Sequence, residues 1–342
     1  MNILIGYGTR PEYIKIKPLI EKLKGVIDFK TVFTGQHLNI IDSDNKPDYI
    51  LSIPEGSNRL DSVLSSSFNN EEIFKDITHV MVQGDTSSAL SLALSAFHRK
   101  IKVIHLEAGL RTYVFENPYP EEMNRQLIAR IADINLCPTK WNKNYLEHEN
   151  VKGENYIVGN TGLDNLVSWK SKCEYTNKVL VTLHRRENHD IIDKWFIELN
   201  KLAKKHQDIE FIFPLHPNPN VQKWKHLLTD ITVIDPLPHN DLLELLVKTK
   251  FVISDSGGLQ EECSFFNKKI IVCRETTERT ESVEYTSTMC EKPAHLKNRF
   301  KWVNENYNVD IYGYAQTCPF GDGKASEKIV KVLLKYKTKK KK

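Results

Sequence analysis

Short apolar segments alternate along the chain with longer segments whose apolar residues recur at helical spacing. The first apolar segment covers residues 2–7, and residues 12–25 follow with the helical pattern and end at Gly25. The alternation continues through apolar segments at 28–35, 77–85, 102–109 and 134–139 and helical segments at 86–100 and 120–133. Strands that alternate with helices in this way predict βαβ units with right-handed crossovers and a parallel sheet.

The alternation breaks near residues 160–169 and then starts again. Apolar segments that each end in polar, glycine or proline residues follow at 177–188, 209–219, 231–238, 250–258 and 268–275. A chain of 342 residues is also long enough for two domains. We therefore expect an α/β protein made of two Rossmann-like domains in tandem.

The composition indicates a folded protein and gives no case for a nucleic-acid partner. Hydrophobic residues make up 40% of the chain, and the formal net charge is only +4. Much of the basic excess lies in the tail at 335–342. We expect this tail to be solvated, with contact to an anionic surface as the alternative.

Cysteine spacing and apolar segment lengths indicate the compartment. The six cysteines are scattered without a C-x-x-C pair, which argues against a zinc site and a disulfide framework and suits a reducing compartment. The N-terminal residues already read as a strand, without a charged leader, and no apolar segment approaches the ~18 residues of a membrane-spanning helix. We expect a cytosolic protein with no membrane partner.

Residues that directly follow the predicted strands are the first candidates for a ligand site. Ligands of such folds bind beyond the carboxyl ends of the strands. The first group of strands supplies Arg10, Glu12, Gln36, His37, Asp85, Glu107 and Arg111, and the second supplies His184, Arg185, Arg186, Glu187, His216, Ser256, Gly257, Gly258, Glu261 and Glu262. The first group is rich in carboxylates, whereas the second is rich in phosphate-binding residue types.

Arg10 stands in a turn that resembles the start of a dinucleotide-binding motif but lacks its third glycine. Pro11 can occupy the first position of a helix, so Arg10 is a fixed cation next to a helix N-terminus. That arrangement favours a diphosphate, in particular one that departs with negative charge. The alternative is an ion pair between Arg10 and Glu12.

The segment at 254–262 also favours an anion. Ser256, Gly257 and Gly258 would let backbone N–H groups approach a phosphate at a helix N-terminus, and Glu262 lies about one turn later, where it could bind ribose hydroxyls. The alternative is a serine that caps an ordinary helix. The segment at 184–188 adds a histidine and two arginines at another strand end, and the alternative there is that Arg185 and Arg186 form a solvated helix start.

Asp85, Glu107 and Glu121 are the candidates for the chemistry. Carboxylates that are brought together cannot all ionise cheaply, so at least one pKa should rise towards the range useful for general acid–base catalysis. Taken singly, each could be a helix cap or part of a structural ion pair. We find no metal-binding signature and expect that neither a metal nor a nicotinamide cofactor is needed.

Motifs in fixed order resemble the non-hydrolysing UDP-N-acetylglucosamine 2-epimerases. They are "GTRPE" (8–12), "TGQH" (34–37), "QGDT" (83–86), "HLEAGLRT" (105–112), "PEEMNR" (120–125), "GNT" (159–161), "HRREN" (184–188), "HPNP" (216–219), "SDSGGLQEE" (254–262), "TTER" (276–279) and "FGDGKAS" (320–326). The resemblance implies a glycosyltransferase-B-like fold with a nucleotide sugar in the cleft between the domains. It implies an N-terminal domain at 1–164 and a UDP-binding domain at 165–342, whose last helix, at about 322–336, packs back on the first.

The resemblance also implies roles for individual residues. Asp85, Glu107 and Glu121 match the catalytic carboxylates, and His184 lies near the leaving diphosphate. The substrate-binding residues implied are Arg10, Lys15, His37, Arg111, Arg125, Arg185, His216, Ser256, Gly257, Gly258, Glu262 and Arg279. Dimers are usual for the family, so we expect a homodimer.

The implied reaction is 2-epimerisation of a UDP-N-acetyl-hexosamine by elimination of UDP to a 2-acetamidoglycal and re-addition of UDP. Within the same fold, the substrate could instead be a UDP-2-acetamido-2,6-dideoxy-hexose, or water could intercept the intermediate in a hydrolysing enzyme. Two other classes are a retaining glycosyltransferase and a silent nucleotide-sugar sensor. Neither of these needs the set Asp85, Glu107 and Glu121, which therefore favours the epimerase.

Overall fold

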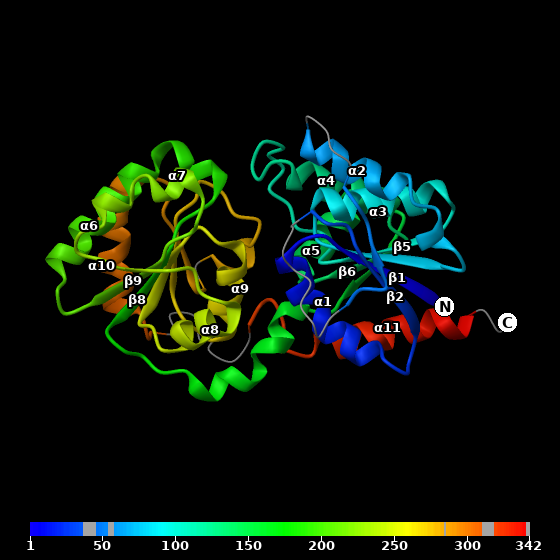
Figure 1. Ribbon diagram of the computed structural model, residues 1–342. Coiled ribbons are helices and arrows are strands. Elements are labelled where there is room, and N and C mark those ends of the chain that lie inside the picture. Colours follow the sequence, from blue (N-terminus) through cyan, green and yellow to red (C-terminus); the bar gives the residue numbers. More distant parts are fainter. Residues whose placement is uncertain (37–45, 54–57, 284, 310–317, 340–342) are drawn as a thin grey trace. The chain divides into compact units, whose positions relative to one another are not determined.

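A computed structural model of the protein describes residues 1–36, 46–53, 58–283, 285–309 and 318–339 (Figure 1). The chain divides into two compact units. The first unit consists of Met1–Asn165 and Gly321–Lys342, and the second of Leu166–Phe320. The last segment of the chain thus belongs to the same unit as the first.

The first unit is built on a parallel sheet of seven strands in the order β3-β2-β1-β4-β5-β6-β7. The strands are β1 (Asn2–Tyr7), β2 (Asp28–Phe33), β3 (Tyr49–Ile50), β4 (His79–Gln83), β5 (Lys102–Leu106), β6 (Ile134–Cys137) and β7 (Glu154–Ile157). The strand order reverses between β1 and β4, and ligands of doubly wound folds bind outside the carboxyl ends at such a point. The predicted strands β1, β2, β4, β5 and β6 are confirmed.

Helices cover both faces of this sheet. They are α1 (Arg10–Leu23), α2 (Arg59–Phe68), α3 (Ser87–His98), α4 (Glu121–Ile131), α5 (Lys140–His148) and α11 (Ala325–Lys339), with the short 3-10 segment η1 (Glu72–Phe74). A longer 3-10 segment, η2 (Thr161–Lys172), begins in this unit and continues into the second. One apolar cluster joins the sheet to α1 and α11, and another joins it to α3. Asp164 caps α11 by accepting hydrogen bonds from the backbone N–H groups of Ala325 and Ser326 at 2.9 and 2.7 Å. These contacts fix the last helix beside α1.

The second unit has a parallel sheet of six strands in the order β10-β9-β8-β11-β12-β13. Its strands are β8 (Lys178–Thr182), β9 (Glu210–Pro214), β10 (Thr232–Ile234), β11 (Phe251–Ser254), β12 (Ile270–Val272) and β13 (Ser287–Met289). Two Rossmann-like α/β units are thereby confirmed. The order again reverses next to the central strand, between β8 and β11, so the carboxyl ends of these two strands are the expected binding edge.

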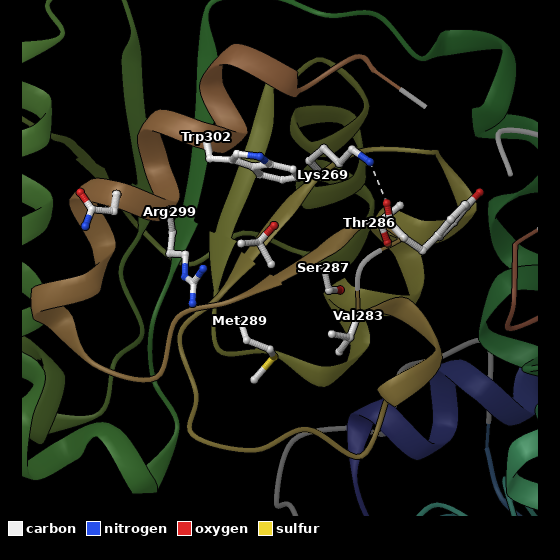
Figure 2. A pocket seen from close by; sticks show the side chains of 10 residues that line it. Lys269, Val283, Thr286, Ser287, Met289, Arg299 and Trp302 are labelled. Carbon is white, nitrogen blue, oxygen red and sulfur yellow. Dashed lines mark hydrogen bonds between the residues drawn. The ribbon is translucent and has the colours of Figure 1, made fainter. Parts of the chain in front are cut away.

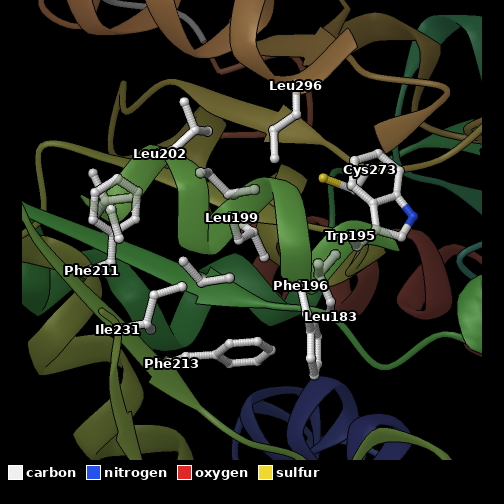
Figure 3. Packing of buried hydrophobic residues seen from close by; sticks show 14 of the residues in the cluster. Leu183, Trp195, Phe196, Leu199, Leu202, Phe211, Phe213, Ile231, Cys273 and Leu296 are labelled. Atoms are coloured by element: carbon white, nitrogen blue, oxygen red, sulfur yellow. The ribbon is translucent and has the colours of Figure 1, made fainter. Parts of the chain in front are cut away.

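Helices and 3-10 segments surround this second sheet. They are η3 (Arg186–Ile191), α6 (Ile192–Lys205), α7 (Pro219–Gln222), η4 (Lys225–Leu227), α8 (His239–Val247), α9 (Gly257–Phe265), η5 (Thr280–Ser282), η6 (Pro293–His295) and α10 (Leu296–Asn306). Figure 3 shows the core on one face, where Phe196 of α6 meets Phe213 of β9 edge to face with ring centroids 5.5 Å apart. Such aromatic packing fixes the strands whose ends carry the candidate site. In the described ranges, neither unit has a helix with the length and apolar content needed to cross a membrane.

Candidate active site

Glu107 lies directly after β5, at the carboxyl edge of the first sheet. Its backbone has φ 65°, a left-handed conformation that residues other than glycine rarely adopt. The buried carboxylate accepts hydrogen bonds from Lys15 Nζ at 2.5 Å, from Asn160 Nδ2 at 3.3 Å and from Gln83 Nε2. Three separate segments of the unit therefore hold this carboxylate in one orientation.

Asp85 follows the neighbouring strand, β4, and is held by α4. Arg125 Nη2 donates to Asp85 Oδ2 at 2.5 Å, and Asn124 Nδ2 donates to the Asp85 carbonyl at 2.9 Å. The capping alternative does not apply, because Thr86 is the N-cap of α3 and its hydroxyl accepts from Ala89 N at 3.1 Å. The Asp85 side chain is 22% exposed, so its carboxylate is paired with a cation and still open to solvent.

Glu121 and Glu122 begin α4 and differ sharply in environment. Glu122 is fully buried and accepts hydrogen bonds from the backbone N–H groups of Thr112 and Tyr113 at 2.9 and 3.1 Å. It also accepts a hydrogen bond from Arg125 Nη1 at 3.2 Å. Glu122 thus anchors the loop before α4, whereas its predicted neighbour Glu121 is only partly buried.

Arg10 is the first residue of α1, and its side chain is exposed. Glu12 does not pair with it. The Glu12 carboxylate instead accepts hydrogen bonds from the backbone N–H groups of Gly8 and Thr9 at 2.9 and 2.7 Å and from the Thr86 hydroxyl at 2.7 Å. Burial raises the pKa of Glu12, although these hydrogen bonds oppose that effect. The capping box of α1 therefore occupies Glu12 and leaves Arg10 at the helix start without that ion pair.

Arg111 is buried in a bidentate ion pair with Glu149. Its Nε and Nη2 donate to the two carboxylate oxygens of Glu149 at 2.7 and 2.9 Å, and its Nη1 donates to the Leu110 carbonyl at 2.7 Å. Burial alone would raise the pKa of Glu149, but the hydrogen bonds and charge of Arg111 lower it overall. This gives Arg111 a role inside the protein, and its role towards a substrate stays a prediction. The predicted residue His37 lies outside the described residues.

His184 stands at the carboxyl end of β8 in the second unit, beside a buried aspartate. Its ring stacks on that of His216 with centroids 5.0 Å apart and an interplanar angle of 12°. Asp255 Oδ2 accepts from the backbone N–H groups of His184 and Arg185, both at 2.9 Å. The pKa of His216 is lowered, first by burial and then by the neighbouring His184. The strand ends of β8, β9 and β11 thus meet at these rings.

The first turn of α9 has the features of an anion site. Ser256 is its N-cap, yet the serine side chain makes no capping hydrogen bond, and the Ser256 N–H donates to Ser254 Oγ at 2.9 Å. The predicted alternative, a serine that caps an ordinary helix, is therefore wrong at the level of the side chain. A helix start that lacks a side-chain acceptor leaves N–H groups for an anion.

Arg279 packs against this first turn. A Cβ added to Gly257 would lie 2.7 Å from Arg279 Nη1, so only glycine leaves room for the guanidinium here. Arg279 Nε donates to Glu261 Oε1 at 2.8 Å, and its Nη1 donates to Glu278. Both carboxylates orient the guanidinium beside the N-terminus of α9.

Glu262 lies on the same helix, and one of its two carboxylate oxygens has a hydrogen-bond partner. Its Oε1 lies 3.1 Å from Nε2 of His239, at the start of α8. Its Oε2 is buried and, among the described residues, has no hydrogen-bond partner. A buried acceptor of this kind normally has a donor, so this oxygen suits a ligand hydroxyl group.

A separate pocket of the second unit, of about 420 Å³, lies beside β13 and α10 (Figure 2). Its lining includes Lys269, Thr286, Ser287, Arg299 and Trp302. The Lys269 amine donates to the Tyr285 carbonyl at 2.7 Å, as the dashed line in Figure 2 shows. None of the predicted site residues lines this pocket, so it is distinct from the candidate active site.

Several supporting residues escaped the sequence reasoning. Gln83 and Asn160 stand in the "QGDT" and "GNT" motifs, and Asp255 stands between the two serines of "SDSGG". Their positions at strand ends were the available signal. What the sequence does not show is that Gln83 and Asn160 both contact Glu107.

Comparison with known proteins gives consistent matches along the chain. A family model described as UDP-N-acetylglucosamine 2-epimerase matches residues 21–334. A Campylobacter jejuni protein named UDP-N-acetylglucosamine 2-epimerase is 37% identical over 379 residues, which cover 98% of each chain. A Salmonella borreze protein of the same name is 36% identical over 367 residues, which cover 96% of this chain and 97% of that one.

Solved structures agree with the sequence matches. The UDP-GlcNAc 2-epimerase from Neisseria meningitidis bound to UDP-GlcNAc has a TM-score of 0.85 at 32% identity, covering 98% of this chain and 100% of that one. The Methanocaldococcus jannaschii UDP-GlcNAc 2-epimerase in complex with UDP-GlcNAc and UDP has a TM-score of 0.81 at 28% identity, with the same coverage. Acinetobacter baumannii MurG, at 11% identity and a TM-score of 0.61, shares the fold alone.

Proposed function

This chain belongs to the UDP-N-acetylglucosamine 2-epimerase family, and we propose that it inverts C2 of a UDP-N-acetyl-hexosamine of the UDP-GlcNAc and UDP-ManNAc type. The observation that carries this proposal is the pair Asp85 and Glu107. They follow the adjacent parallel strands β4 and β5, and each is paired with a cation, Arg125 or Lys15. Carboxylates fixed at one edge of a sheet are suited to removing and returning a proton on a bound sugar.

The proposed reaction has two stages. A carboxylate removes the proton from C2 while the bond between C1 and the diphosphate oxygen breaks; the C–H electrons form the C1=C2 double bond, and UDP leaves with the electron pair of the broken bond. A proton is then delivered to the opposite face of C2, and UDP adds back to C1. We assign this proton chemistry to Asp85, Glu107 and Glu121, and leave open which of them is the C2 base.

We assign UDP binding chiefly to the second unit. The first turn of α9 and the guanidinium of Arg279 suit the diphosphate, because both present positive charge and N–H donors. The buried Oε2 of Glu262 suits a ribose hydroxyl. His184 and, from the first unit, Arg10 are the residues that we assign to the charge that grows on the departing diphosphate.

We further propose a non-hydrolysing enzyme that acts as a cytosolic homodimer in polysaccharide precursor synthesis. This rests on the motif resemblance described above. The domain boundary at 164–165 is part of the same proposal. The alternatives are a hydrolysing outcome, which the following experiment separates from epimerisation, and a 6-deoxy sugar nucleotide as the true substrate or glycosyl transfer, both of which would leave UDP-GlcNAc unchanged.

The test is incubation of the purified protein with UDP-GlcNAc in deuterated water, followed by proton NMR. Removal of the C2 proton by a carboxylate must place solvent deuterium at C2 of the product, and recovered substrate gains label if the step reverses. Free N-acetylmannosamine together with UDP would indicate hydrolysis. Product formed without deuterium at C2 would contradict the elimination route, and unchanged UDP-GlcNAc would direct attention to a 6-deoxy substrate or to glycosyl transfer.

A further inference from the structure

Asp255 is fully buried after β11, and its two carboxylate oxygens have different surroundings. Oδ2 accepts hydrogen bonds from the backbone N–H groups of His184 and Arg185 at 2.9 Å each and from Asn188 Nδ2 at 3.0 Å. Oδ1 is buried and has no hydrogen-bond partner among the described residues. An acceptor in this state normally pairs with a donor, and the nearest ring nitrogen belongs to His184.

The His184 ring faces this oxygen. Its Nδ1 lies 3.7 Å from Asp255 Oδ1, slightly beyond hydrogen-bond distance, and its side chain is 35% exposed. His216 is stacked almost parallel to the ring, which restricts its rotation. With Nδ1 towards the buried carboxylate, Nε2 is the nitrogen on the other side of the ring.

We infer that Asp255 is a positioning residue for His184, holding a proton on Nδ1 so that Nε2 is presented to the departing diphosphate. Oδ2 fixes the turn that carries His184, while Oδ1 selects the tautomer with the proton on Nδ1. A carboxylate beside Nδ1–H stabilises the imidazolium relative to the neutral ring. The imidazolium can then donate from Nε2 to the diphosphate oxygen as negative charge develops there.

Other titratable and charged groups also lie near His184. His216, which follows β9, stacks on the ring and would oppose a second positive charge, and burial lowers the pKa of His216. Arg185 precedes η3 and follows His184 in sequence, and His189 of η3 has its Nε2 3.1 Å from the His184 carbonyl. Asp255 is the anionic group that Nδ1 of the His184 ring faces.

The role at the diphosphate rests on the proposed function, whereas the contact between Asp255 and His184 does not. The substitution Asp255→Asn separates the two functions of the carboxylate. The amide oxygen can keep the three hydrogen bonds of Oδ2, which places the amide NH₂ where Oδ1 faces His184. A donor at that position favours a lone pair on Nδ1 and therefore disfavours the imidazolium.

The readout is nitrogen NMR of the His184 ring in the purified full-length protein. In the wild type we expect the Nδ1–H tautomer, and in Asp255→Asn we expect the proton of the neutral ring on Nε2. In turnover of UDP-GlcNAc we expect kcat to fall by about 10-fold or more with a smaller change in KM, because the charge is needed as UDP departs. In the His184→Asn background, Asp255→Asn should lower kcat little further.

Asp164→Asn is the matched control, because Asp164 also accepts two backbone N–H bonds, and the donors of both are the first residues of α11 and not a histidine. It should lower thermal stability and leave the His184 tautomer unchanged. An Nε2–H tautomer in the wild type, or an Nδ1–H tautomer in Asp255→Asn, would overturn the inference. If Asp255→Asn does not fold, the wild-type tautomer alone decides. The expected tautomers in a protein without epimerase activity would remove the proposed function and leave the contact between Asp255 and His184.

Discussion

Lys15 of α1 and Glu107 after β5 form an ion pair, with Nζ and Oε1 2.5 Å apart, across 92 positions of sequence. Both side chains are largely buried, so water screens the charges less than at the surface. Gln83 and Asn160 also donate hydrogen bonds to the same carboxylate. The pair therefore fixes where a carboxylate stands at the binding edge of the first sheet.

We predict that Lys15→Met lowers kcat by ~10²-fold or more, because a misplaced carboxylate loses its alignment with the C2 proton. Steady-state kinetics with UDP-GlcNAc measure this. Lys22→Met is the control. Lys22 lies on the same helix as Lys15, but its ion pair, with Glu327 of α11 at 3.0 Å, is exposed. Equal kcat values for the two variants would show that Lys15 does not serve the reaction.

Separate substitutions of Asp85 and Glu107 by the matching amide should abolish most turnover but keep UDP binding. The amide keeps the shape of the side chain and removes the base, so we expect losses of ~10²–10⁴-fold in kcat. UDP binding, measured by calorimetry, should change little because we assign the diphosphate chiefly to the second unit. Glu147→Gln, an exposed carboxylate of α5, is the control. A large loss of UDP affinity in either amide variant would contradict this division.

Gly257→Ala should weaken UDP binding through Arg279. The added methyl group would lie 2.7 Å from Arg279 Nη1, so the guanidinium must move away from the first turn of α9. We expect a rise of about 10-fold in the dissociation constant for UDP, equivalent to one lost charge-assisted contact. Gly258→Ala gives a comparison, because the nearest atom to its Cβ would be 3.9 Å away. A larger effect at Gly258 than at Gly257 would argue against a role of Arg279.

The sequence predicted the buried central strands and the edge strand β10, and it missed the other three edge strands. β3 (Tyr49–Ile50), β7 (Glu154–Ile157) and β13 (Ser287–Met289) are short, lie at an edge and carry partly exposed side chains. Such strands lack the continuous apolar run on which the prediction depends. The central strands are buried against helices on both faces, and their continuous apolar runs therefore allow their prediction from the sequence.

The same limit applies to the candidate site. That Asp85 and Glu107 lie at neighbouring strand ends follows from the alternation of strands and helices, because parallel strands end at one edge. Their partners do not follow from it. Glu149 pairs with Arg111 across 38 positions, and the choice between Glu121 and Glu122 depends on which carboxylate meets the loop N–H groups. These contacts depend on packing, which no local pattern encodes.

His105 lies in β5, two residues before Glu107, and its burial makes the free energy of unfolding depend on pH. It is completely buried, and its Nε2 lies 2.8 Å from the Gly84 carbonyl. Burial lowers the pKa of His105 to about 4, from an ordinary value of 6.5. Between these values the unfolded chain binds a proton at this residue and the folded protein does not. The contribution to stability is therefore complete above pH 6.5 and is lost as the pH falls towards 4.

Over that window the folded state should lose about 3 kcal/mol through this residue. His105→Gln keeps a donor for the Gly84 carbonyl but cannot take up a proton. We expect the variant to be less stable than the wild type near neutral pH, where the packing of the ring is lost, and to show a shallower decline of stability on acidification. Urea unfolding across the range measures both effects. The carboxylates and the other histidines contribute equally to the two proteins, so the difference between the curves isolates His105. Parallel curves would mean that the ring is protonated in the folded state as readily as in the unfolded chain, which would contradict its placement at a fully buried position of β5.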